Sequence, residues 1–372
     1  MILLLSYPDD PMVELVARRL EARGARFFRF DEAQFPERAR ISARYSIGRG
    51  LTYELQVDGQ SIDLGEIQTA WDHRPGPCEP SAALDPTARR FAARQSQQFL
   101  DDVWRTLECR WMPAHKDIVL RWQHKASQLA LAQSLGFEIP HTLITNDPSE
   151  LLEFHREQSG RIVSKVYHRN IQQPQMGEAQ MGEAGGAGSE PCAYVCMTQI
   201  VSNRDLGYAS SIRHAPVIFQ SYVRKQIELR VTVVGQKVLT AAIHSQATHR
   251  TRHDWRHADL QHTRYTPYTL PAEIETRCLE LVARMGLCFG TIDLVLTPEG
   301  RYVFLEINPS GQWRWVETMS GLPIADSIAE LLAADVGQDG ILRADGQSAR
   351  AAVDNRRAGC QPAPQSCLAG TR

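Results

Sequence analysis

The chain opens with an apolar run at residues 1–5, which is followed by a Pro/Asp turn. Apolar side chains then recur at intervals of three and four residues, and Gly24 ends this predicted helix. These apolar positions are Val13, Val16, Ala17 and Leu20. Residues 25–31 predict a second strand, so the start is typical of a doubly wound α/β unit. It lacks the G-x-G-x-x-G motif, and no nicotinamide dinucleotide site is therefore predicted.

Alternating apolar and polar positions predict further strands up to residue 77, and a second unit begins near residue 115. The predicted strands are 41–47, 51–57 and 61–67, and residues 69–77 predict a strand followed by a turn. Helices are predicted at 87–107 and 124–136. A strand at 139–147 leads to a helix whose N-cap is Asp147 or Ser149. Residues 161–168 predict a strand with Lys165 near its middle.

Residues 172–191 contain the pentapeptide QMGEA twice and few apolar side chains, which predicts a flexible loop. A phosphate-binding glycine loop is the alternative, but no Lys-Ser/Thr pair follows the glycines. Two hairpins are predicted further on, one turning at Gly235-Gln236 and one formed by 289–308. The other predicted elements are strands near 193–201 and 215–223 and helices at 272–285 and 323–335. Residues 337–372 lack apolar periodicity and are expected to be disordered.

Composition narrows the classes of function. The 372-residue chain has 41 basic and 43 acidic residues, so it lacks the basic excess of a nucleic-acid-binding protein. It has no apolar run of about 18 residues for a transmembrane helix, and its apolar start is too short for a signal peptide. The eight cysteines, including Cys192 and Cys196, follow no zinc-site spacing. We expect a cytoplasmic protein with reduced cysteines and with no nucleic-acid or membrane partner.

The strongest chemical signal lies in the hairpin of residues 291–308. We expect Asp293 to stand opposite Phe304, and Glu306 and Asn308 to share its face, because side chains alternate along a strand. The apolar face is expected to hold Ile292, Leu294, Leu296, Val303, Leu305 and Ile307. Two carboxylates and an amide oxygen suit Mg²⁺. The alternative is the solvated polar face of a surface hairpin.

Other charged positions extend this signal. Lys165 lies in an apolar strand, where a lysine needs a partner such as triphosphate, and Lys125 starts a helix. Alone, either would be a surface lysine with a packed apolar stem. Glu228 and Arg230 share one strand face within 219–235, an extended segment that could receive an adenine edge.

The spacing of His249, His253 and His257 would align three imidazoles on a helix and suit a transition metal. A basic, mobile segment that faces the substrate is the favoured interpretation.

Together these residues resemble the ATP-grasp superfamily, and more closely the ATP-grasp ribosomal peptide maturases of microviridin-type (graspetide) pathways. The matching segments are AWDHRP at 70–75, LITNDP at 143–148, ELRVTVVG at 228–235, AAIHSQ at 241–246, DWR at 254–256 and FLEINPSGQWRWVE at 304–317. The resemblance covers roughly residues 1–335. The chain departs from the family pattern at three places. His124 stands where Asn or Tyr is usual, and the proline that usually follows Lys165 is missing. The QMGEA insert lies where a loop should cover the phosphates.

The resemblance implies an α/β (α+β) ATP-grasp fold with a Rossmann-like pre-ATP-grasp domain and two lobes that clamp ATP. The implied domains are 1–114, a small lobe at 115–218 with the flexible insert 172–191, a large lobe with the metal site at 219–336, and the tail. The resemblance implies that Lys125 and Lys165 bind the phosphates and that Gln220, Tyr222 and Val223 line the adenine pocket. It assigns ribose or metal to Glu228, and Mg²⁺ to Asp293, Glu306 and Asn308. It assigns the transferring phosphate to Arg230 and Arg256.

The implied reaction converts an Asp or Glu side chain of a ribosomal precursor peptide into an acyl phosphate. A hydroxyl or amine of the same peptide then closes a macrolactone or macrolactam. The implied partner is a precursor with a leader and an acidic core that bears Thr, Ser or Lys, and a homodimer is one expected assembly. His244 and Asp254 are candidate general bases. Two alternatives stay open: an amino-acid ligase like the ribosomal-protein glutamate ligases, and an inactive scaffold that only binds peptide.

Overall fold

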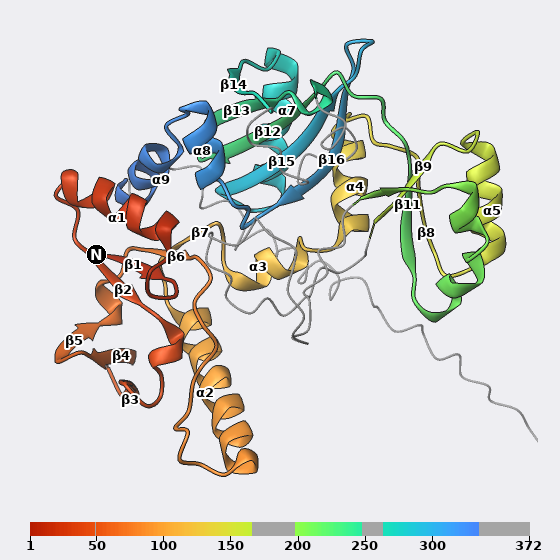
Figure 1. Ribbon diagram of the computed structural model, residues 1–372. Helices are drawn as coiled ribbons and strands as arrows, with labels where there is room; N and C mark the ends of the chain where they lie inside the picture. Colours follow the sequence, from red (N-terminus) through yellow and green to blue (C-terminus); the bar gives the residue numbers. More distant parts are fainter. Residues whose placement is uncertain (49, 166–197, 248–262, 335–372) are drawn as a thin grey trace, which may run out of the picture.

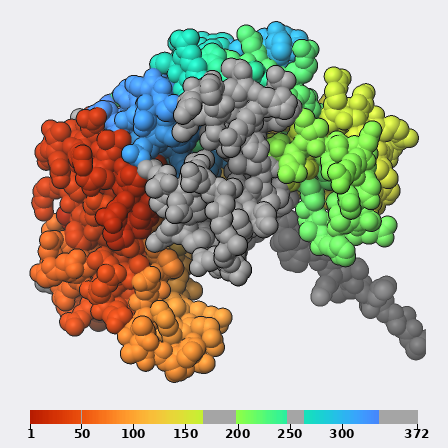
Figure 2. Space-filling view, in the orientation of Figure 1, coloured from red at the N-terminus to blue at the C-terminus, as the bar shows by residue number. Residues whose placement is uncertain are grey.

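The computed structural model describes residues 1–48, 50–165, 198–247 and 263–334. The described residues form an N-terminal unit, a small antiparallel sheet and a large antiparallel sheet (Figure 1). Figure 2 shows the N-terminal unit, in red and orange, on one side of the molecule and the small-sheet unit, in yellow and green, on the other. The predictions for the QMGEA insert, the three histidines, Asp254, Arg256 and the tail lie outside the described residues.

The N-terminal unit is the predicted doubly wound start. Its parallel sheet has the strand order β2-β1-β6-β7, and β3, β4 and β5 form a separate antiparallel sheet. The carboxylate of Asp10 caps the first helix by accepting from the backbone N–H groups of Met12 and Val13. The elements are β1 (Ile2–Leu5), α1 (Pro11–Ala22), β2 (Phe27–Phe30), β3 (Ala39–Ser46), β4 (Gly50–Val57), β5 (Gln60–Asp63), β6 (Thr69–Asp72), α2 (Pro86–Thr106) and β7 (Arg110–Met112).

The small sheet has the strand order β10-β9-β11-β8. Asp147 is the N-cap of its first helix, and it is one of the two residues predicted for this role. Leu151, Phe154, Ile162 and Phe219 form part of the apolar core of this unit. The elements are β8 (Thr142–Thr145), α5 (Pro148–Glu157), β9 (Ile162–Lys165), β10 (Gln199–Ile200), α6 (Asn203–Leu206) and β11 (Val217–Ser221).

The large sheet has the order β14-β13-β12-β15-β16, and its two predicted hairpins are confirmed. The turn between β12 and β13 places Gly235 at a φ of 59°, a left-handed conformation that favours glycine. The strands are β12 (Ile227–Val234), β13 (Lys237–Ile243), β14 (Tyr265–Tyr268), β15 (Phe289–Leu296) and β16 (Tyr302–Asn308). The helices are α7 (Ala272–Arg284), α8 (Arg314–Ser320) and α9 (Ile324–Ala333). Sequence analysis did not predict α8, which follows the fully buried Trp313.

Two helices connect the units: α3 (Lys116–Arg121) and α4 (Lys125–Ser134). Leu129 and Ala132 of α4 pack in the same apolar cluster as Leu294 and Phe304 of the large sheet. Figure 1 shows α4 beside β16. The helix that carries Lys125 is thus fixed to the sheet that carries Asp293 and Glu306.

The hairpin of β15 and β16 contains a β-bulge, which the predicted register lacked. Asp293 pairs with Glu306, not with Phe304, and Phe304 pairs with Leu294. The register shifts between Asp293 and Leu294, so Leu305 is the extra residue on β16. The prediction that Asp293 faces Phe304 is therefore wrong.

The bulge also changes which side chains of β16 face the core. Phe304 and Ile307 lie in one core cluster although they are three residues apart, while Leu305 lines an open cavity on the other face. The predicted core position of Leu305 is therefore wrong, whereas Val303 is buried as predicted.

Within the described ranges, no helix has the length and apolar character needed to cross a bilayer.

Candidate active site

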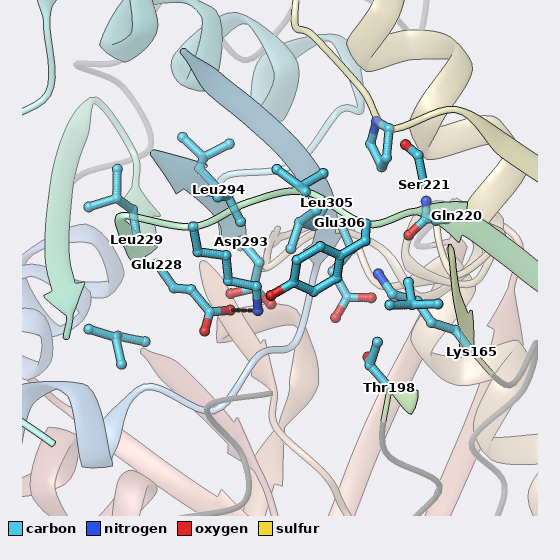
Figure 3. Close-up of a pocket in the computed structure, with 17 residues that line it drawn as sticks. Lys165, Thr198, Gln220, Ser221, Glu228, Leu229, Asp293, Leu294, Leu305 and Glu306 are labelled. Atoms are coloured by element: carbon cyan, nitrogen blue, oxygen red, sulfur yellow. Dashed lines mark hydrogen bonds and ion pairs between the residues drawn. The ribbon is translucent and has the colours of Figure 1, made fainter. Parts of the chain in front are cut away.

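An open cavity lies between the small sheet and the large sheet. Both sheets contribute side chains to its wall. Figure 3 shows Lys165 entering from the small sheet, with Asp293 and Glu306 on the large-sheet side. Seven predicted site residues line it: Lys165, Gln220, Tyr222, Val223, Glu228, Asp293 and Glu306. The fold therefore gathers residues that are up to 141 positions apart, the separation of Lys165 and Glu306.

The predicted metal ligands share one face of the hairpin. Asp293 pairs with Glu306, and Asn308 pairs with Thr291, two residues before Asp293 on β15. The predicted common face of the three ligands is thus confirmed, although a bulge produces it. Among the described residues, no three His, Cys, Asp or Glu side chains form a metal-binding group, so a site here would consist of two carboxylates and the Asn308 amide. Such an all-oxygen set fits Mg²⁺.

Two positively charged side chains contact the carboxylates of Asp293 and Glu306. One nitrogen of Arg230, Nη1, donates to both oxygens of Asp293, at 2.8 Å and 3.0 Å. The Arg230 side chain is 8% exposed, and its Nη2 also donates to the carbonyl of Gln312 at 3.2 Å. Lys125 Nζ donates to Glu306 Oε2. Each carboxylate oxygen carries two lone pairs, so these contacts leave acceptor positions for a metal ion.

Glu228 is fixed from two sides. Its Oε2 accepts from Lys225 Nζ at 2.9 Å, and its Oε1 accepts from Ser245 Oγ at 2.8 Å. The residue is 6% exposed. A buried carboxylate needs such partners, and these two set its direction at the cavity wall.

The chain between β11 and β12 forms one rim of the cavity. The backbone N–H groups of Ser221 and Tyr222 donate to the carbonyls of His141 and Arg161, both at 2.9 Å. Gln220 is buried, and its side chain donates to Thr142 Oγ1 at 3.0 Å. This rim is therefore anchored to the small sheet at its start, and it can receive the flat edge of a base.

The turn after β16 is held against β15 by a close approach. A Cβ placed on Gly311 would lie 1.8 Å from Oγ1 of the buried Thr291. Thr291 Oγ1 in turn donates to the carbonyl of Asn308 at 3.3 Å. The turn carries Gln312, whose carbonyl binds Arg230, so glycine at 311 lets the turn reach the site.

Some predicted residues lie elsewhere. Lys125 and Asn308 do not line the cavity, but Lys125 contacts Glu306 and Asn308 lies on the face of Asp293. His244 does not line it either, and its Nε2 lies 3.2 Å from Thr266 Oγ1. Arg256 and Asp254 fall outside the described residues.

Sequence analysis missed residues that support the site. Lys225 lines the cavity and contacts Glu228. Gln128 is 2% exposed and binds the backbone of Ile307. Their signals were local: Lys225 is three residues before Glu228, and Gln128 shares the apolar face of its predicted helix with Leu129 and Ala132.

Comparison with protein families matches two parts of the chain. Residues 1–118 match the MvdD pre-ATP-grasp domain, and residues 196–332 match the RimK-like ATP-grasp domain. The second range contains the large sheet and the carboxylate pair. No curated protein matches the chain.

Solved structures similar to the whole fold include the macrocyclase MdnC from Microcystis aeruginosa MRC, bound with the precursor peptide MdnA. It is 30% identical with a TM-score of 0.73, and the match covers 89% of this chain and 99% of that chain. The macrocyclase MdnB from the same organism is 32% identical with a TM-score of 0.68, over 89% and 98%. A RiPP-associated ATP-grasp ligase from Chryseobacterium gregarium, in complex with ADP and a leader and core peptide, is 26% identical with a TM-score of 0.77, over 89% and 96%.

Proposed function

We propose that this chain, which belongs to the ATP-grasp macrocyclases, crosslinks the side chains of a ribosomally made precursor peptide. The γ-phosphoryl group of ATP passes to a carboxylate oxygen of an Asp or Glu side chain, which forms an acyl phosphate and releases ADP. A hydroxyl or amine of the same peptide attacks the acyl carbon, gives up its proton, and expels phosphate. The product is a macrolactone or macrolactam. The observation that carries this proposal is the cavity in which Lys165 faces Asp293 and Glu306.

The cavity rim would hold the nucleoside. We assign adenine to the segment of Gln220, Tyr222 and Val223. The amides of Ser221 and Tyr222 are used within the small-sheet unit, and we assign the next backbone donor, that of Val223, to the base edge. Glu228, held by Lys225 and Ser245, would accept from ribose hydroxyls or bind metal.

The phosphates would lie between the two sheets. Lys165 would bind them from the small sheet, and Lys125 from the end of α4. Asp293, Glu306 and Asn308 would hold Mg²⁺, which neutralises charge on the β- and γ-phosphate oxygens when bound. Arg230, fixed by Asp293 and Gln312, would stabilise the transferring phosphoryl group. We assign the same task to Arg256.

The partner would be a precursor peptide with a leader and an acidic core. The test is incubation of the purified chain with its cognate precursor, ATP and Mg²⁺, followed by mass spectrometry. We expect ADP formation and the loss of one water for each ring. Products that open in mild base would be esters, and resistant products would be amides. An unchanged peptide mass, with ATP intact, would contradict the proposal.

The match of residues 196–332 to the RimK-like domain favours a second candidate, a ligase that adds free amino acids to a carboxyl group. The same assay separates the two candidates. With amino acids present, the second predicts a gain in peptide mass, whereas crosslinking predicts a loss.

A further inference from the structure

Among the described residues, the segment 128–138 contacts the outer edge of β16 at two positions. β16 is the edge strand of the large sheet, so one row of its backbone groups would have no strand partner. Glu138 covers one position, where its carbonyl accepts from the N–H of Phe304 at 2.8 Å. Gln128 of α4 covers another, at Ile307.

Gln128 pairs with Ile307 as a neighbouring strand would. Its Nε2 donates to the Ile307 carbonyl at 2.8 Å, and its Oε1 accepts from the Ile307 N–H at 3.3 Å. Nε2 also donates to the carbonyl of Trp122 at 2.6 Å. The whole amide group is therefore used, in a residue that is 2% exposed.

This contact, the clamp of Gln128 on the backbone of Ile307, lies next to the point where the pairing of β16 with β15 is interrupted. The bulge at Leu305 interrupts the ladder directly before Glu306. Backbone groups that point out from one strand edge are normally an even number of residues apart, but Phe304 and Ile307 both point outward and are three apart. Beyond the bulge, the outward contact at Ile307 fixes which face Glu306 and Asn308 take.

We infer that Gln128 is a positioning residue that sets the directions of Glu306 and Asn308 by holding the residue between them. This inference rests on the proposed function, in which these two residues hold Mg²⁺. Lys125, one helical turn before Gln128, contacts the Glu306 side chain, so α4 contacts β16 at two adjacent residues. Trp122, whose carbonyl Gln128 binds, donates through Nε1 to the Met285 carbonyl at 2.7 Å, which fixes the start of α4 to the large-sheet unit.

The test uses the full chain with Gln128→Met, which keeps the length of the side chain and removes its polar groups. The matched control is Gln133→Met, at an exposed position of the same helix. Two quantities are measured: the affinity for ADP without metal, and the affinity for Mn²⁺ at saturating ADP by electron paramagnetic resonance. We expect Gln128→Met to weaken Mn²⁺ binding by about tenfold or more, since partners that orient metal ligands typically contribute this much. ADP affinity should change by less than about twofold, and the control should match wild type in both, because neither substitution removes a nucleotide contact.

Equal Mn²⁺ affinity in Gln128→Met and wild type would overturn the inference, and so would a parallel loss of ADP affinity, which indicates a general structural role. If that variant does not fold, Gln128→Asn replaces it. Its amide is one methylene shorter, so we expect a smaller loss of Mn²⁺ affinity, and no loss would again overturn the inference. Failure of wild-type protein with ADP to bind Mn²⁺ would instead contradict the proposed metal site itself.

Discussion

Replacing Gly311 with alanine should displace the turn that follows β16. The added Cβ would lie 1.8 Å from Thr291 Oγ1 and 2.9 Å from both Thr291 Cβ and Cγ2. Real Cβ atoms essentially never come closer than 3.0 Å, so the nearest contact is short by 1.2 Å (3.0 − 1.8). Thr291 is a buried residue of a central strand and cannot move away without disturbing the sheet.

The expected cost is about 3 kcal/mol of unfolding free energy, the upper end for an overpacked site. It corresponds to a fall in Tm of roughly 6–12 °C, at about 2–4 °C per kcal/mol. Thr291→Ala alone should cost about 1 kcal/mol, since it loses a hydrogen bond to the Asn308 carbonyl and leaves a small cavity. In the double variant the Oγ1 and Cγ2 contacts are absent, and most of the alanine penalty should disappear.

The assay is a double-mutant cycle in which thermal unfolding and ADP release are measured for each variant. Gly311→Ala should also lose activity, because the displaced turn carries the Gln312 carbonyl away from Arg230. Additive effects of the two substitutions, or a Gly311→Ala protein that melts and turns over like wild type, would refute the reasoning.

The remaining predictions concern charged groups. Glu306→Gln should leave stability within about 1 kcal/mol, because its partner Lys125 is partly exposed, yet it should lower Mg²⁺-dependent ADP release by about a hundredfold or more. Arg230→Met should lower the unfolding free energy by about 3 kcal/mol in denaturant titration, since it leaves Asp293 without its partner, and wild-type stability would contradict this. Burial holds the pKa of His73 at about 3, so between about pH 6.5 and 3 the unfolded chain binds a proton that the folded chain does not. Stability contributed by neutral His73 is present above about pH 6.5 and falls with decreasing pH, by at most about 1.4 kcal/mol per pH unit. His73→Gln should remove this slope in melts between pH 6.5 and 5, and an unchanged slope would show that His73 is not its source.

Local patterns were enough to predict most elements of the fold. Gly235 and the apolar alternation on either side of it predicted the hairpin of β12 and β13, and helical spacing predicted α7. The shared face of Glu306 and Asn308 also followed from alternation along β16. These features depend on neighbours in the sequence, which is why the sequence alone revealed them.

The parts that sequence analysis missed depend on contacts between distant segments. The bulge at Leu305 changes which side chains of β16 face the core. The alternation of apolar and polar residues along one strand cannot reveal an extra residue in its pairing with another strand. The clamp of Gln128 on Ile307 joins positions 179 residues apart, and the pairing of Lys125 with Glu306 joins positions 181 apart. Lys125 and Arg230 were predicted as phosphate ligands, but their contacts with the two carboxylates required the folded arrangement.

Transfer of oxygen from the peptide to phosphate tests the central claim most directly. A precursor peptide whose Asp and Glu carboxyl groups carry isotopically heavy oxygen is incubated with the chain, ATP and Mg²⁺, and the released phosphate is analysed by mass spectrometry. An acyl-phosphate route breaks the bond between the acyl carbon and the phosphate oxygen, so each ring closed should yield one phosphate that carries one heavy oxygen, together with ADP. Unlabelled phosphate in step with ring formation, or the release of AMP and diphosphate, would contradict activation of the peptide carboxylate by phosphoryl transfer.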